Sequence, residues 1–152
     1  MALLALLASC GFHLQNAFVV PTAMERTYIA TEDRHSFFYH ELRRQLRTAG
    51  MQLADVPDDA TATLTISVDE TGQRVLSVST RNVPTEYEVF YSIEYGVDIG
   101  DTNLLKRQFI TLTRDYTYDE TLVLGKAHEE QLLREGIAKD LVRIVLKQLG
   151  TL

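Results

Sequence analysis

The chain has 152 residues, a formal net charge of −6 and a single cysteine. This length suits one domain, which would bury roughly two-thirds of the surface of its unfolded chain. The negative charge argues against nucleic-acid binding, the lone cysteine excludes an internal disulfide, and no apolar run reaches the roughly 20 residues of a membrane-spanning helix.

The chain begins with an apolar run that ends in two small residues and a cysteine. Residues 2–8 are apolar, like the h-region of a secretory signal peptide, and Ser9 and Cys10 follow. Small residues directly before the cysteine suit a signal peptidase, which binds its cleavage site as an extended chain. The pattern resembles the lipobox of bacterial lipoproteins. It predicts a signal peptide at residues 1–9 and a single domain at residues 10–152, with Cys10 as the lipid-bearing mature N-terminus.

The predicted signal peptide lacks a basic n-region, because no lysine or arginine precedes the apolar run. We therefore expect it to be truncated at its start. The alternative is an ordinary buried N-terminal segment with Cys10 in the core. Under the lipoprotein interpretation, acyl chains on Cys10 tether the domain to a membrane, since each buried methylene contributes about 0.8 kcal/mol. No other cofactor is expected.

The first half of the domain predicts a short strand and a helix. Thr27–Ala30 is a strand candidate, and Asp33 can cap a following helix. The apolar residues on one face of that helix recur at spacings of four, four and three residues. It consists of Phe38, Leu42, Leu46 and Ala49. Gly50 should end the helix in a left-handed conformation.

A region of alternating apolar and polar residues follows, as in half-buried strands. Leu64–Val68 and Leu76–Thr80 both alternate, and Glu70–Gln73 lies between them. Residues 62–81 are therefore either a hairpin with a tight turn or one long bent strand with a bulge. After a turn at Asn82–Thr85, the clearest alternation places one set of residues on a buried face. That set is Tyr87, Val89, Tyr91, Ile93, Tyr95 and Val97.

Gln108–Tyr118 is the last predicted strand, and a helix from about Leu122 to Leu149 closes the chain. The apolar stripe of that helix is Leu133, Ile137, Leu141, Ile144, Val145 and Leu149. Together these elements predict an α+β fold. We expect two helices packed on one face of a small, mostly antiparallel four-stranded sheet.

The sequence offers little for catalysis. His35 and His40 are five residues apart, which puts them on different faces of a helix, and His128–Glu130 lacks the second histidine of a metal motif. No nucleophile elbow, P-loop or dinucleotide-binding glycine pattern is present. We therefore predict a protein that is not an enzyme and binds no metal.

Two basic residues are expected at one end of the molecule. The strand order brings the turn that carries Arg81 and the start of the last helix, with Lys126, to the same edge of the sheet. Helix-start N–H groups favour anions, so a phosphate-bearing ligand is the natural candidate. Arg114 adds charge if its side chain reaches past its strand. The alternative is that Arg81 and Lys126 are simply solvated.

Several segments, in order, resemble the LptE (RlpB) family of lipopolysaccharide-assembly lipoproteins. Cys10 to Leu14 reads Cys-Gly-Phe-His-Leu, where that family typically shows Cys-Gly-aromatic-His/Gln-Leu. The other matching segments are Leu42–Leu46, Thr85–Glu88, Arg114–Asp119, Leu124–Lys126 and Ile144–Leu149. They span essentially the whole mature chain.

The resemblance implies an outer-membrane lipoprotein on the periplasmic side, tethered to the inner leaflet of that membrane through Cys10. It would plug the lumen of an LptD-type β-barrel, support the assembly of that barrel and take part in lipopolysaccharide insertion. The family's basic residues linked to lipopolysaccharide contact match Arg81 and Lys126. The alternative function is another small outer-membrane lipoprotein, such as a pilotin-like adaptor or a transport-system auxiliary subunit.

Overall fold

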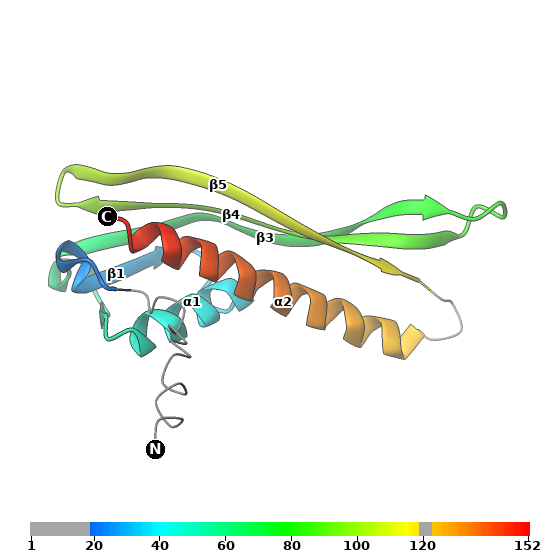
Figure 1. Cartoon of the computed structure of the whole chain (residues 1–152), viewed down its shortest axis with the longest axis horizontal. Helices are drawn as coiled ribbons and strands as arrows, with labels where there is room; N and C mark the ends of the chain where they lie inside the picture. Colours follow the sequence, from blue (N-terminus) through cyan, green and yellow to red (C-terminus); the bar gives the residue numbers. More distant parts are fainter. Residues whose placement is uncertain (1–18, 119–122) are drawn as a thin grey trace, which may run out of the picture.

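The computed structural model of the chain describes residues 19–118 and 123–152, with side chains described from residue 127 onwards in the second range. Figure 1 shows an elongated molecule in which two helices lie along one side of a long, twisted sheet. The predicted signal peptide and Cys10 lie outside the described residues. Within the described part of the chain, no helix is long and apolar enough to cross a bilayer.

The sheet has five strands in the order β2-β1-β3-β4-β5. They are β1 (Arg26–Thr31), β2 (Gln52–Ala54), β3 (Ala62–Val78), β4 (Pro84–Ile99) and β5 (Thr102–Thr117). β1 pairs in parallel with β2 and β3, whereas β3–β4 and β4–β5 are antiparallel. The predicted mostly antiparallel sheet is confirmed, but the count of four strands was wrong. The missed strand, β2, has only three residues, too few for an alternating pattern to mark it.

β3 is one continuous strand, so the turn at Glu70–Gln73 does not form and the long-strand alternative holds. Gly72 pairs with Phe90 of β4, and the irregularities in register fall at residues 66–68 and 75–78 instead. A Cβ atom on Gly72 would lie 2.6 Å from the Phe90 ring, well inside van der Waals contact. The glycine therefore leaves room for an aromatic ring from the neighbouring strand.

Two helices cover one face of the sheet, as predicted (Figure 1). They are α1 (Phe37–Thr48) and α2 (Val123–Leu149), and two short 3-10 helices, η1 (Thr22–Met24) and η2 (Pro57–Asp59), lie in the connections. α1 packs on α2, and α2 in turn packs on β4 and β5. α2 therefore returns the chain across the same face that α1 already occupies.

The ends of α1 follow local hydrogen bonding. Ser36, and not Asp33, caps the helix, because its Oγ accepts a hydrogen bond from the Tyr39 N–H at 3.0 Å. Asp33 lies too far before the first turn and accepts a bond from the His35 N–H at 2.7 Å. Gly50 follows the helix with φ +88°, which confirms the predicted left-handed residue.

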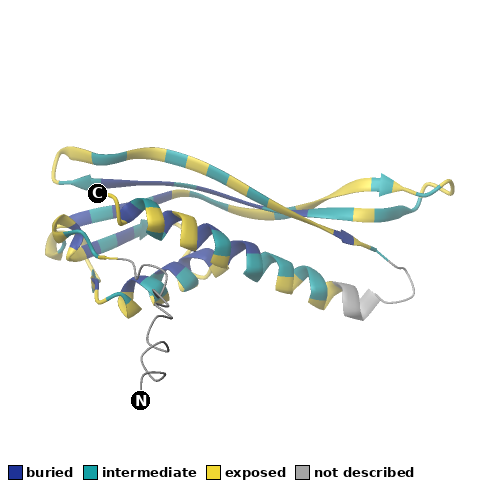
Figure 2. Ribbon diagram, in the orientation of Figure 1, coloured by how far each residue is buried: buried dark blue, intermediate teal, exposed yellow. Residues whose placement is uncertain are grey.

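The core lies between the sheet and the helices and is concentrated in the half of the molecule that holds β1 (Figure 2). The inner face of β4 supplies its centre. Its side chains are all 1% exposed or less: Val89, Tyr91, Ile93, Tyr95 and Val97. From α2 the buried positions include Ile137, Leu141, Val145 and Leu149, as predicted, whereas Ile144 is 39% exposed and points away from the core.

A hydrogen-bond network joins the start of α1 to β3 and β4. Ser36 Oγ donates to one carboxylate oxygen of Asp69 at 2.5 Å, and the Tyr91 hydroxyl donates to the other at 2.7 Å. The Tyr91 hydroxyl also accepts a bond from the Phe38 N–H at 3.3 Å. Burial raises the pKa of Asp69, and the two donated bonds offset that effect only in part.

This network predicts a pH dependence of stability. Because the pKa of the Asp69 carboxyl is raised in the folded state, the protonated carboxyl stabilises the fold relative to the ionised one. This stabilisation is fully present below pH 3.8, the ordinary pKa of the group, and is lost as pH rises through the pKa of the folded state. The side chain of the Asp69→Asn variant cannot ionise. The melting temperature of this variant should therefore rise relative to that of the wild type as pH increases from 3.8 towards neutrality. Thermal unfolding from pH 3.5 to 7 measures this difference. A constant difference across the range would contradict the assignment.

The Gly72–Phe90 pair predicts a non-additive effect of substitution. Gly72→Ala should destabilise the fold by about 1 kcal/mol, because the new methyl group displaces the Phe90 ring. In a Phe90→Ala background the same change should cost little, since the obstructing ring is gone. Urea unfolding of the two single variants and the double variant gives the coupling energy. If the two substitutions change the free energy of unfolding additively, the position of the Phe90 ring does not depend on the glycine at position 72.

Candidate functional site

The β3–β4 hairpin projects to one end of the long axis and carries Arg81 in its turn (Figure 1). The Ser79 N–H donates to the Val83 carbonyl at 2.8 Å, and the Asn82 N–H donates to the Ser79 carbonyl at 2.9 Å. Asn82 has φ +59°, a left-handed conformation that asparagine tolerates in tight turns. The Arg81 side chain is exposed and forms no ion pair within the described residues. It is therefore available to an external anion.

The start of α2 lies at the same end of the molecule as the hairpin turn (Figure 1). β5 ends beside the base of the hairpin, where the Tyr118 N–H donates to the Thr85 carbonyl at 2.8 Å. Lys126 belongs to the first turn of α2, and its side chain lies outside the described residues. Both segments lie at the end of the molecule that the sequence predicted, although the hairpin turn projects beyond the start of α2 (Figure 1). The ligand role of Arg81 and Lys126 stays a prediction.

Apolar side chains near the end of β3 are exposed, contrary to the pattern of a half-buried strand. Val75, Leu76 and Val78 are 46–52% exposed. Leu76 and Val78 belong to the alternation that predicted one buried face, but neither α1 nor α2 lies over the hairpin turn (Figure 2). The tip of the molecule therefore presents apolar surface next to the Arg81 cation, an arrangement that suits an amphipathic anion.

A tyrosine cluster supports the base of the hairpin. The rings of Tyr87 and Tyr116 stack with centroids 5.7 Å apart, and Tyr118 meets Tyr87 edge-on at 5.4 Å. The Tyr116 hydroxyl donates to Gln73 Oε1 at 2.9 Å, and burial raises its pKa. Aromatic pairs of this kind contribute roughly 0.5–1.5 kcal/mol each beyond burial. They stiffen the three strands where the helices cease to cover them.

Arg114 does not reach past its strand to the hairpin end, so the condition under which it would add charge there is not met. Its guanidinium lies across the face of α2, where it pairs with the Asp140 carboxylate at 2.5 Å. A Cβ atom on Gly136 would lie 3.3 Å from the same guanidinium, so this glycine in the middle of α2 makes room for the arginine. Arg114 therefore fastens α2 to β5.

The histidines singled out in the sequence do not form a metal centre. The rings of His35 and His40 lie with centroids 6.4 Å apart, and His128 is exposed on α2. Glu130 instead pairs with Arg134 one helical turn later. Among the described residues, no group of three or more histidine, cysteine, aspartate or glutamate side chains could hold a metal ion.

Comparison with known sequences gives one family. The family model described as "LptE: Lipopolysaccharide-assembly" matches residues 24–149. The chain is similar to the "LPS-assembly lipoprotein LptE" of Yersinia pestis (strain Pestoides F), with 24% identity over 148 residues. That match covers 95% of this chain and 70% of the relative, and the Yersinia pseudotuberculosis protein matches equally well.

Comparison with solved structures gives the same fold. The solution structure of lipoprotein B from Nitrosomonas europaea has a TM-score of 0.76 and 26% identity, covering 92% of this chain and 90% of that one. The crystal structure of rare lipoprotein B from Shewanella oneidensis has a TM-score of 0.71 and 21% identity, covering 83% of this chain and 94% of that one. The arrangement of two helices on a long mixed sheet is thus shared with bacterial lipoproteins.

Proposed function

The chain belongs to the LptE family of lipopolysaccharide-assembly lipoproteins, and from that membership we propose a specific role for it. It is a non-enzymatic outer-membrane lipoprotein, anchored through Cys10 on the periplasmic side. It plugs an LptD-type β-barrel, supports the assembly of that barrel and contacts lipopolysaccharide during insertion into the outer leaflet. The polar, elongated sheet with a cationic tip is the observation that carries this proposal.

The outer face of the sheet suits contact with the polar lumen of a barrel. Hydroxyl and carboxylate side chains pair across its strands, as in Ser77 with Glu86 at 2.8 Å and Ser67 with Glu94 at 2.5 Å. Thr113 and Asp115 of β5 are exposed beside them. The lumens of large outer-membrane barrels are polar, so a plug should offer hydrogen-bonding surface on the side away from its helices.

The hairpin tip suits contact with lipopolysaccharide, which combines anionic groups with apolar chains. Arg81 supplies a guanidinium that can bind a phosphate with two parallel hydrogen bonds, and Val78, three residues earlier in the chain, supplies exposed apolar surface. Lys126 adds a second cation from α2 in this proposal. The overall charge of −6 repels anions, so binding there depends on these local groups.

Purification of the tagged full-length protein from outer membranes in mild detergent tests the proposed partner. We expect a large β-barrel to co-purify at a one-to-one ratio, because the plug and the barrel form one assembly. Recovery of another membrane complex would favour the adaptor or auxiliary-subunit alternative. Recovery of the protein alone would also contradict the proposed role.

Charge reversal at the tip tests the proposed lipopolysaccharide contact. Arg81→Asp combined with Lys126→Asp should weaken lipopolysaccharide binding by about tenfold or more, since two charge-assisted contacts are lost. The barrel complex should survive, because Arg81 is exposed in a turn and the barrel contact is proposed for the outer face of the sheet. Arg47→Asp combined with Lys106→Asp is the matched control, as it makes the same change in charge at exposed positions elsewhere. Unchanged binding in the tip variant would remove both residues from the site.

A further inference from the structure

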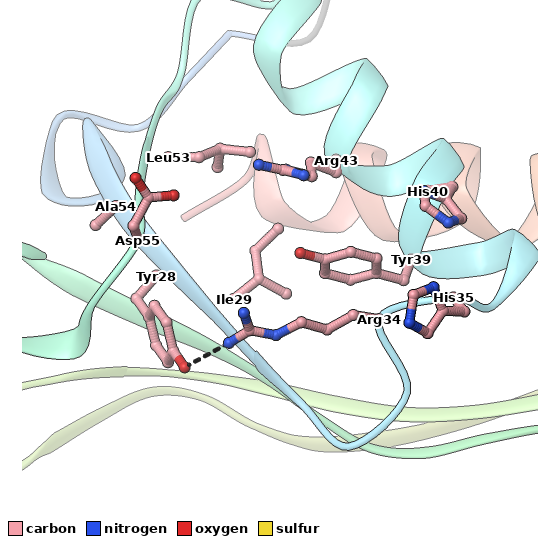
Figure 3. Close-up of a pocket in the computed structure, with 10 residues that line it drawn as sticks. All are labelled: Tyr28, Ile29, Arg34, His35, Tyr39, His40, Arg43, Leu53, Ala54 and Asp55. Atoms are coloured by element: carbon pink, nitrogen blue, oxygen red, sulfur yellow. Dashed lines mark hydrogen bonds between the residues drawn. The ribbon is translucent and has the colours of Figure 1, made fainter.

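A second polar site lies in the half of the molecule away from the hairpin tip. A cavity of about 270 Å³ opens between β1, β2 and the first turns of α1 (Figure 3). Four basic side chains line it, from Arg34, His35, His40 and Arg43, against one acidic side chain, from Asp55. In a chain with a net charge of −6, this gathering of basic groups runs against the overall composition.

The two arginines of this cavity lack acidic partners. Figure 3 shows that Arg34 and Arg43 extend past either side of Tyr39 towards β1 and β2. The Arg34 guanidinium donates to the Tyr28 hydroxyl at 3.1 Å, which holds it in place and leaves the O–H of Tyr28 able to donate in turn. Within the part of the chain that the structure describes, neither arginine forms an ion pair.

Tyr39 supplies an unused donor at the centre of the site. The residue is only 8% exposed, because its ring packs into the core beneath α1. Its hydroxyl points into the space between the two arginines, and it forms no hydrogen bond with any described residue (Figure 3). The hydroxyl is not among the buried polar atoms of the described residues that lack a partner, so it opens into the cavity and is available to a ligand.

We propose that this cavity binds a phosphoryl group. Two guanidinium groups and the Tyr39 O–H form a set of donors around one space, and guanidinium groups match the oxygens of a phosphate in pairs. Asp55 on the far wall repels such an anion and limits its affinity. The site is separate from the hairpin tip and does not depend on the function proposed for it.

The phosphoryl group can come from a free phosphate ester or from the headgroup of a lipid, and titration separates the two sources. The full-length ¹⁵N-labelled chain, in a phosphate-free nonionic detergent, is titrated with inorganic phosphate and with dihexanoyl phosphatidic acid at constant ionic strength. Saturable NMR shifts around residues 28–43 are expected with both. Tighter binding of the lipid identifies a headgroup site, whereas equal or tighter binding of phosphate identifies a site for free esters.

Substitutions in the cavity test the assignment of donors. Arg34→Gln combined with Arg43→Gln should weaken binding by about 100-fold, and Tyr39→Phe by about three- to tenfold, since the latter removes only the hydroxyl. Asp55→Asn should tighten binding by a few-fold, because a repulsive charge is removed. Arg47→Gln combined with Lys147→Gln is the control for charge, since both residues are exposed outside the cavity.

Either of two results would overturn the proposal. One is the absence of saturable binding of both probes by the wild type. The other is unchanged affinity in Tyr39→Phe, which keeps the packing of the ring and whose lost hydroxyl bonds to no described residue. Because Tyr39→Phe is not expected to disturb the fold, its result stands even if the double arginine variant fails to fold.

Discussion

Burial of the inner face of β4 is the constraint on which the rest of the structure depends. β4 pairs with β3 on one side and β5 on the other, and its inward side chains are almost completely covered. Tyr91 and Tyr95, the largest of them, keep their hydroxyls satisfied by Asp69 and Gln148 while their rings fill the core. Burial raises the pKa of Tyr95 to about 12, so its hydroxyl remains a donor at physiological pH. The helices are arranged to cover this face.

The helices do not cover the whole sheet, and this mismatch creates the two ends of the molecule. Where α1 and α2 overlie β1 and β4, the side chains form a closed core, and beyond that region β3 and β4 continue as a hairpin with exposed apolar residues. The Arg134 guanidinium donates a hydrogen bond to Thr71 Oγ1 at 2.7 Å and so joins α2 to β3, while Glu130 of the same helix holds that guanidinium in place. One end therefore offers an amphipathic tip and the other a cavity rich in donors.

Sequence patterns predicted where the site residues lie in the secondary structure better than they predicted which residues those side chains contact. The position of Arg81 in a turn followed from the strand order, but the sequence could not show whether Arg114 reaches the same end, and Arg114 pairs with Asp140. The cavity around Tyr39 was missed because Arg34 and Arg43 meet β2, whose three residues carry no periodic signal. Tyr39 itself reads as a helix residue beside the apolar stripe, and only its surroundings show that the ring is buried while the hydroxyl opens into the cavity.

The sequence by itself determined the two helices, the buried face of β4 and the family, because hydrophobic periodicity and ordered motifs are local properties of the chain. The period of two in residues 87–97 and the recurrence of apolar residues every three or four positions in both helices predicted the buried faces, except at Ile144. Only the tertiary structure decided that residues 62–78 form one strand, that Gly72 makes room for Phe90, and that β2 adds a fifth strand. These outcomes depend on pairing between residues distant in the chain, and no local pattern encodes that pairing.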